Sequence, residues 1–192
     1  MQDYMNYRWF YTSSNKLVVG GKNDEQNELV LKNFLKEDYI VIHTTNPGSP
    51  FMIIQSYNPT KKDIDETAVF CSCFSKSWKL GSKKIDVDVF KGSQIFKTKN
   101  MKTGTFGVKG SKKTIKVKPE LFLVIQKGKL RAIPKTKKEN VLAEITPGKM
   151  SKEQAVEKIY ILLKNKFNFS ISKEEIMRAI PSNNLNIKTL EM

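Results

Sequence analysis

Cysteine and histidine are scarce in this sequence, whose 192 residues include two cysteines and one histidine. Cys71 and Cys73 stand too close together for an ordinary disulfide. They also fall in a segment whose apolar residues recur at helical spacing, which places Cys71 in the core and argues against a metal site. We therefore expect reduced thiols in a cytoplasmic protein that binds no metal and no cofactor.

Long hydrophobic runs are also absent. No segment approaches the roughly 18 consecutive apolar residues that a membrane-spanning helix needs. The first ten residues, MQDYMNYRWF, have neither the basic start nor the apolar stretch of a signal peptide. The 39% of apolar residues is nevertheless enough for a core. We expect a soluble protein without a membrane partner, built as one domain with an appendage or as two small domains.

The sequence lacks the common enzyme motifs as well. It has no G-x-S-x-G, no H-E-x-x-H and no G-x-x-x-x-G-K-[ST] pattern. A Ser-His-Asp triad would have to use His43, and a lone histidine that ends an apolar strand is more often a packed core residue. An enzyme that acts on a nucleotide or RNA through His43 is therefore the weaker alternative.

Acidic residues are few in one part of the chain. Residues 79–138 hold 18 lysines and arginines against 3 acidic residues, whereas residues 1–78 hold 8 against 9 and residues 139–192 hold 8 against 7. The net charge of +15 thus comes from the central segment. A cationic surface concentrated in this way is typical of a site for a polyanion such as nucleic acid.

Hydrophobic patterns predict an α+β fold. Short apolar or alternating segments predict strands at 8–12, 17–19, 38–43, 51–55, 85–89, 94–97, 106–109, 114–117, 121–126, 130–133 and 141–145. Helical spacing predicts a helix at 24–35 and a second one with Asp63 as N-cap and Glu66 as its capping-box partner. We expect a largely antiparallel or mixed β-sheet core with two packed helices and a small C-terminal helical extension.

A polar stretch at Lys135–Glu139 suggests a division of the chain. The expected domains are residues 1–135 and an accessory unit at residues 139–192. That unit is predicted to contain a strand, a turn at Thr146–Gly148 and two helices, each opened by a serine cap. Its helical part, residues 151–180, supports an alternative function as an adaptor that docks on a protein partner.

Two regions are candidates for phosphate contact. Between Gly20 and Asn27, a strand leads through two glycines into a helix N-terminus, whose free N–H groups and dipole favour an anion, with Lys22 as a mobile cation. In the basic segment, lysines alternate with aliphatic residues and so line one face of a sheet, or they bracket the loop at Thr103–Thr105. The aromatic run Trp9–Tyr11 offers faces for base stacking if exposed, although alternate members are expected in the core.

The order of several motifs resembles a known family. The motifs are Arg8-Trp9-Phe10, Leu17-Val18-Val19-Gly20-Gly21-Lys22, Gln26-Asn27-Glu28, Asp38 and His43, the Gly48-Ser49 loop, Ala68…Ser75…Trp78, and Lys97 followed by Gly104 and Phe106. Together they cover about residues 6–120 and resemble the NFACT-R domain, the RNA-binding domain of ribosome quality-control and fibronectin-binding-protein-A-like factors. The chain departs from the family pattern at Lys22, where arginine is usual.

The resemblance implies a non-catalytic RNA-binding protein of stand-alone, archaeal type, associated with the ribosome through tRNA or ribosomal RNA in translation or nascent-chain quality control. The residues expected to contact RNA are Arg8, Lys22, Asn23, Asn27, His43, Lys97, Lys99, Lys102, Lys109, Lys112, Lys116 and Lys118. Charge reversal at Lys112, Lys116 and Lys118 is expected to weaken binding more than reversal at Lys152 and Lys158. The sequence leaves the oligomeric state open.

Overall fold

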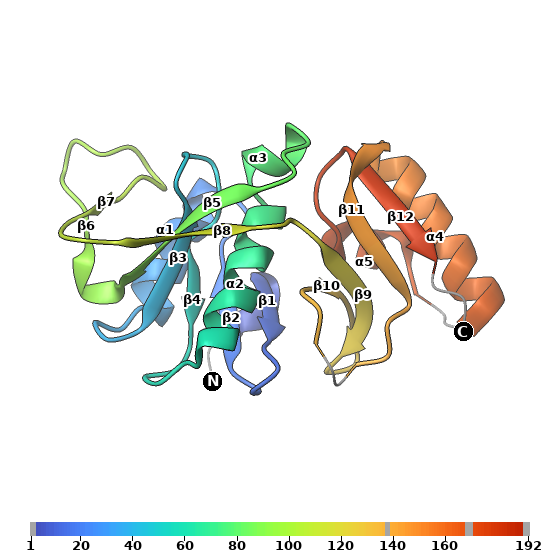
Figure 1. Cartoon of the computed structure of the whole chain (residues 1–192), viewed down its shortest axis with the longest axis horizontal. Coiled ribbons are helices and arrows are strands. Elements are labelled where there is room, and N and C mark those ends of the chain that lie inside the picture. The colour runs from blue at the N-terminus through green and yellow to red at the C-terminus, as the bar shows by residue number, and fades with distance from the viewer. Residues whose placement is uncertain (1–2, 137–138, 168–170, 190–192) are drawn as a thin grey trace.

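The structure, a computed structural model, describes residues 3–136, 139–167 and 171–189. Its first part is built on a six-stranded antiparallel sheet (Figure 1). In their order across the sheet, the strands are β1 (Arg8–Tyr11), β2 (Leu17–Gly20), β4 (Met52–Ile54), β3 (Ile40–Thr44), β5 (Ile85–Lys91) and β8 (Lys113–Val117). A small hairpin of β6 (Ile95–Phe96) and β7 (Gly107–Val108) interrupts the path from β5 to β8. We call residues 3–118 the amino-terminal unit.

One helix covers each face of this sheet. α1 (Asp24–Phe34) packs on the face that includes Val41, and α2 (Lys61–Cys73) packs on the face that includes the next residue, Ile42. Neighbouring residues of a strand point to opposite faces, so a strand buried on both sides has a continuous apolar run. The short helix α3 (Lys76–Lys79) follows α2. The predicted α+β fold with two packed helices is confirmed.

A four-stranded antiparallel sheet forms the carboxy-terminal unit, residues 121–189 (Figure 1). Its strands, in order across the sheet, are β10 (Lys129–Ile133), β9 (Leu121–Gln126), β11 (Ala143–Met150) and β12 (Leu185–Thr189). Two helices accompany this sheet, α4 (Lys152–Phe167) beside β12 and α5 (Lys173–Ala179) beside β10. The expected C-terminal helices are therefore present, within a sheet-based unit.

This unit differs from the sequence prediction in three respects. β9 and β10 precede the expected boundary at residues 135–139, yet they share a sheet with β11 and β12, so the sheet runs across that boundary. The sequence pattern does not predict β12, because only Leu185 and Ile187 alternate there as buried apolar residues. The turn predicted at Thr146–Gly148 is wrong: these residues belong to β11, where a bulge accommodates Pro147.

Side chains of β9 and β10 form hydrogen bonds with backbone groups on the outer edge of β1. The Tyr11 N–H donates to Gln126 Oε1 (2.7 Å), and Gln126 Nε2 donates to the Tyr11 carbonyl (2.9 Å). Arg131 donates from Nε and Nη2 to the Trp9 carbonyl (3.2 and 2.8 Å). One continuous hydrophobic cluster also connects the two units, and its members include Phe10, Phe70, Leu123 and Leu163. The units are therefore joined by both hydrogen bonds and a common core.

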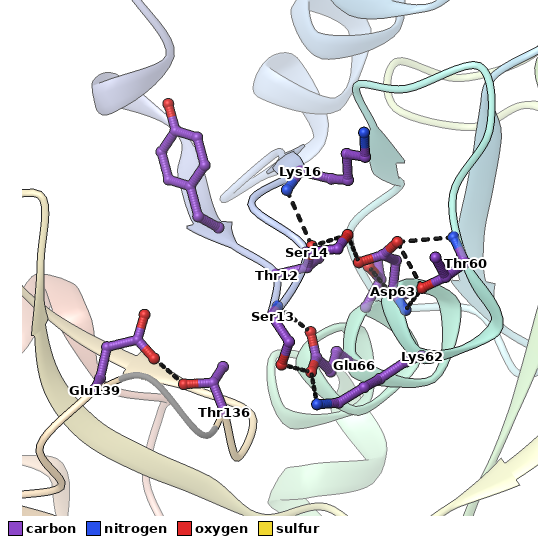
Figure 2. A network of polar contacts seen from close by, with 12 residues as sticks. Thr12, Ser13, Ser14, Lys16, Thr60, Lys62, Asp63, Glu66, Thr136 and Glu139 are labelled. Carbon is purple, nitrogen blue, oxygen red and sulfur yellow. Dashed lines mark hydrogen bonds and ion pairs between the residues drawn. The ribbon is translucent and has the colours of Figure 1, made fainter.

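Two buried carboxylates clamp the β1–β2 turn to the start of α2 (Figure 2). Asp63 accepts from the Ser14 hydroxyl (2.5 Å), and Glu66 accepts from the Ser13 N–H (2.8 Å). Thr60 is the N-cap: its hydroxyl accepts from the Asp63 N–H (3.2 Å), while Asp63 accepts from the Thr60 N–H (2.7 Å). The prediction of Asp63 as the cap is wrong, because Thr60 and Asp63 themselves form the capping box.

The two cysteines are free thiols in the core. Burial raises the pKa of Cys71 to about 12, so this thiol stays protonated at neutral pH. The predicted position of Cys71 in the core is confirmed. In the part of the chain that the structure describes, no helix combines the length and the apolar character needed to cross a bilayer, and no three metal-ligating side chains gather.

Candidate nucleic-acid interface

The glycine pair before α1 permits close packing. A Cβ atom on Gly21 would lie 2.4 Å from Oδ1 and 2.6 Å from the backbone N of Asn27, and one on Gly20 would lie 2.2 Å from Sδ of Met52. Asn27 is buried, and its Oδ1 accepts from the Phe51 N–H (3.4 Å). Gly21 is thus required by the contact of α1 with the sheet, in which Asn27 also takes part, whereas Gly20 leaves room for the Met52 side chain of the neighbouring strand β4.

Side chains already occupy part of the first turn of α1. Asn23 Oδ1 accepts from the Gln26 N–H (2.8 Å), and Gln26 Oε1 accepts from the Lys22 N–H (3.1 Å). The Lys22 ammonium donates to the Asn6 carbonyl (2.6 Å), which fixes its direction. The expected anion site made of free N–H groups is therefore partly filled, and cationic side chains become the main anion-binding feature of this region.

Four of the predicted contact residues line one cleft of about 280 Å³: Arg8, Lys22, Asn23 and Asn27. The Arg8 guanidinium lies over the Phe74 ring, 4.1 Å from its centroid. Within the described residues it has no hydrogen-bond or ion-pair partner, so its donors remain available to a ligand. Three further cations line the same cleft, namely Lys76, Lys79 and Lys152, against one carboxylate, Asp24.

The cations around this cleft raise each other's electrostatic energy. Burial lowers the pKa of Lys22, and the nearby charges of Arg8, Arg131 and Arg178 lower it further. Burial also lowers the pKa of Lys152, and the charge of Arg8 lowers it further. A bound anion would relieve both effects, because it favours the charged form of its neighbours. The cleft therefore has the electrostatics of an anion-binding site.

Lys76, Lys79 and Lys152 were absent from the residues predicted to bind. Lys76 and Lys152 lie in segments of balanced charge, and only the tertiary fold brings them to Arg8. The sequence offered one signal. Lys152 opens α4 directly after the Ser151 cap, where a cation opposes the helix dipole. Charge reversal at Lys152 was expected to weaken binding less than reversal at Lys112, Lys116 and Lys118, and its position in the cleft argues against this expectation.

Lys97 lies beside α1 and stabilises the local structure there. It forms an ion pair with Glu28, donates to the carbonyls of Lys102 (3.0 Å) and Thr105 (3.2 Å), and lies over the Phe106 ring. The ammonium thereby fastens the β6–β7 loop to the helix. Three other predicted contacts in this loop region, Lys99, Lys102 and Lys109, are exposed at the surface and do not line the cleft.

The lysines around β8 are paired with carboxylates. Lys112 forms an ion pair with the buried Asp88, Lys116 pairs with Asp86 (3.5 Å), and Lys118 pairs with Glu120 (2.9 Å). Burial alone would raise the pKa of Asp88, but hydrogen bonds from Lys112, Thr114 and Thr45 bring it below its usual value. These pairs reduce the net charge of the face on which most of the RNA affinity was expected.

His43 and the aromatic run lie apart from the cleft lining. The His43 ring packs on Phe51, with centroids 4.5 Å apart, and its Nδ1–H donates to the Thr44 carbonyl (2.7 Å). Trp9 and Phe10 are 1% and 0% exposed, which confirms that they belong to the core. Neither of these two rings offers a face for base stacking.

Comparison with known proteins identifies the family. Residues 6–110 match the model of the NFACT protein RNA binding domain. The chain belongs to this family. The matched residues include Arg8, Lys22, Asn23 and Asn27, so the amino-terminal wall of the cleft is part of the RNA-binding domain itself.

Relatives of this NFACT-R chain come from archaea, animals and bacteria. The archaeal Rqc2 homolog aRqcH of Methanocaldococcus jannaschii is 27% identical over 93% of the chain, an alignment that includes most of the carboxy-terminal unit. The ribosome quality control complex subunit NEMF homolog of Drosophila melanogaster is 30% identical over 55%, and the Rqc2 homolog RqcH of Bacillus subtilis is 29% identical over 61%. The chain spans only 28%, 11% and 20% of these proteins.

A solved structure shares the fold. The C-terminal part of the fibronectin/fibrinogen-binding protein from Streptococcus suis superimposes with a TM-score of 0.54, at 23% identity, over 59% of this chain and 45% of that one.

Proposed function

We propose that this chain binds RNA, either tRNA or ribosomal RNA, and works at the ribosome in cytoplasmic quality control of translation. The observation that carries the proposal is the cationic cleft beside Arg8 and Lys22, which lies in the part that belongs to the RNA-binding family. The relatives named above are Rqc2 and NEMF proteins of ribosome quality control. Phosphate contacts from such cations supply most of the affinity in sequence-independent binding.

The proposed role is binding without catalysis. His43, the single histidine, packs on Phe51 and donates to a backbone carbonyl, away from the cleft. On α4, Ala155, Ile159 and Leu163 are buried and Ile161 is exposed, so the described residues of this helix present no extended apolar face for the alternative role as an adaptor through residues 151–180.

The test is RNA binding as a function of salt. Fluorescently labelled unfractionated tRNA is titrated with protein at about 50 and about 200 mM salt, where each phosphate contact contributes a log–log slope of roughly −0.7 to −0.9. We expect Arg8→Gln and Lys22→Gln each to weaken binding about threefold to tenfold, in line with the loss of one charge-assisted contact.

Lys32→Gln is the matched control for Lys22→Gln, because Lys32 is exposed in the last turn of α1. Its affinity should equal that of the wild type. An affinity that hardly changes with salt, or equal losses in all three variants, would contradict the proposed function.

A further inference from the structure

A second and larger cleft adjoins the first. It measures about 940 Å³ and shares Arg8, Lys22 and Lys152 with the first cleft, so the two form one groove. Pockets of about 300–1,000 Å³ hold organic ligands of drug size, and a nucleotide is of that class. We call the combined space the composite groove, because the amino-terminal unit lines one side and the carboxy-terminal unit lines the other.

The composite groove concentrates positive charge from both units. The amino-terminal unit contributes Arg8, Lys22 and two lysines of α3, and the carboxy-terminal unit contributes Lys129, Arg131, Lys152 and Arg178. Three carboxylates oppose these eight cations. The excess of five charges is a third of the chain's net charge of +15, gathered on a small part of its surface.

These cations differ from the lysines of β8 in their pairing. Across residues 3–136, 139–167 and 171–189, none of the eight groove cations lies within 4.0 Å of a carboxylate oxygen. By contrast, Lys112, Lys116 and Lys118 each have such a partner. Like charges that converge without internal neutralisation are typical of a site that a polyanion completes.

Two groove cations of the carboxy-terminal unit are positioned by the fold, Arg131 through its side chain and Lys152 through its backbone. Arg131 donates twice to the Trp9 carbonyl and lies over the Trp9 ring, 4.5 Å from its centroid. The Lys152 N–H donates to Asn183 Oδ1 (2.8 Å), and Ser151 caps the helix that starts there. A preorganised cation loses less entropy when it binds phosphate.

We propose that the composite groove binds the sugar–phosphate backbone of a single RNA strand and that the carboxy-terminal unit supplies about half of the phosphate contacts. This inference rests on the RNA-binding function proposed above. The concave, nucleotide-sized shape suits one strand, and the exposed side chains of Met5 and Met177 on its wall offer apolar contact to a ribose or base. The carboxy-terminal unit is then part of the RNA site.

The test uses labelled oligouridylate as a single-stranded probe and the full chain as the protein. We expect Lys152→Gln/Arg178→Gln to bind the probe about tenfold more weakly, and the magnitude of its salt slope to fall by about 1.4, or roughly 0.7 for each lost contact. Lys164→Gln is the matched control, since Lys164 is exposed on α4 outside the groove, and it should bind like the wild type. Thermal unfolding checks that each variant is folded.

Three other outcomes separate the claims. Unchanged binding by the double variant, together with loss of binding in Arg8→Gln/Lys22→Gln, would overturn the composite groove and leave the RNA-binding function standing. Absence of RNA binding by the wild type would overturn the function itself. If polyglutamate at equal charge concentration displaced the probe as well as unlabelled oligouridylate does, the groove would be a site for acidic polypeptide and the RNA assignment would be overturned.

Discussion

Lysines of equal formal charge have different roles in this fold, according to their nearest neighbours. Lys97 is bound to Glu28 and two carbonyls, and Lys112 is bound to Asp88, whereas Lys152 has a pKa lowered by burial and by the cations around it. Exposed ion pairs stabilise a protein by only about 0–1 kcal/mol. Their larger effect here is to cancel charge locally, so the count of lysines in a segment overstates its attraction for RNA.

His43 is predicted to contribute to pH dependence of stability. Burial lowers its pKa below the usual value and outweighs the opposing effects of the backbone hydrogen bonds with Thr44 and Ser49 and of the Asp88 charge, while Lys112 lowers the pKa further. The unfolded chain then binds more protons as the pH falls from about 6.5 towards the folded pKa, so the free energy of unfolding should decrease over that range.

The measurement is urea unfolding of the wild type and His43→Gln between about pH 7.5 and 5.5. The variant should lose this part of the pH dependence, while its affinity for tRNA should stay within about twofold of wild type, since His43 lies outside the groove. A large loss of affinity would show that His43 takes part in RNA binding.

At the scale of elements, the clamp between the β1–β2 turn and α2 is expected to be a main local determinant of stability. Asp63 is fully buried and holds Ser14 and Thr60. Asp63→Ala removes the capping-box partner and leaves these donors unsatisfied, so we expect a loss of about 2–3 kcal/mol of unfolding free energy.

Asp65→Ala is the control on the same helix. Asp65 is partly exposed and its carboxylate pairs with Lys61 (2.6 Å), an i,i+4 contact worth about 0.3–0.5 kcal/mol. Chemical denaturation of both variants gives the comparison. Similar losses in the two would mean that the clamp does not stabilise the turn.

Periodicity identified most elements, and it failed where two local arrangements are equally consistent with one pattern. Thr60 and Asp63 can both cap a helix, and the bond from the Asp63 N–H to the Thr60 hydroxyl shows that Thr60 does. β12 has two buried apolar residues, Leu185 and Ile187, and becomes a strand because β11 offers it an edge. Thr146–Gly148 has turn residues and is extended because β12 pairs with Thr146 and Pro147.

At the scale of the whole molecule, the common core predicts that the two units unfold together. Gln126 is buried between them and satisfies both backbone groups of Tyr11. Gln126→Ala leaves those groups unpaired and should lower the free energy of unfolding by about 1–3 kcal/mol within a single calorimetric transition. Truncation at residue 138 would cut through the second sheet, so it is unsuitable for separating the functions of the units.

Asn186→Ala is the control for this change. Asn186 is exposed on β12, and its side chain bonds the Thr146 hydroxyl at 3.3 Å. Asn186→Ala should have little effect on the free energy of unfolding. Two separate transitions in the wild type would show that the units fold independently.

Only part of the site could be predicted from the sequence, because some of its residues come together only in the tertiary fold. Arg8, Lys22 and Asn23 are close in the fold because adjacent elements carry them, and all three lie within the family match at residues 6–110. Arg131, Lys152 and Arg178 reach the same place only because the fold brings β10, α4 and α5 to one cleft with Arg8 of β1. Segment charge cannot report such convergence, since it adds charges along the chain rather than in space.

The two edge strands of the six-stranded sheet differ in whether side chains of the carboxy-terminal unit cover them. β1 is covered by Gln126 and Arg131, but β8 forms the other end of the sheet. An open edge strand can pair with an edge of another molecule, which is a common start of aggregation. Lys113 and Lys116 are exposed on β8, and such charges are known to prevent edge-to-edge pairing. We therefore expect the lysine-rich strand that first suggested an RNA surface to oppose edge-to-edge pairing between molecules.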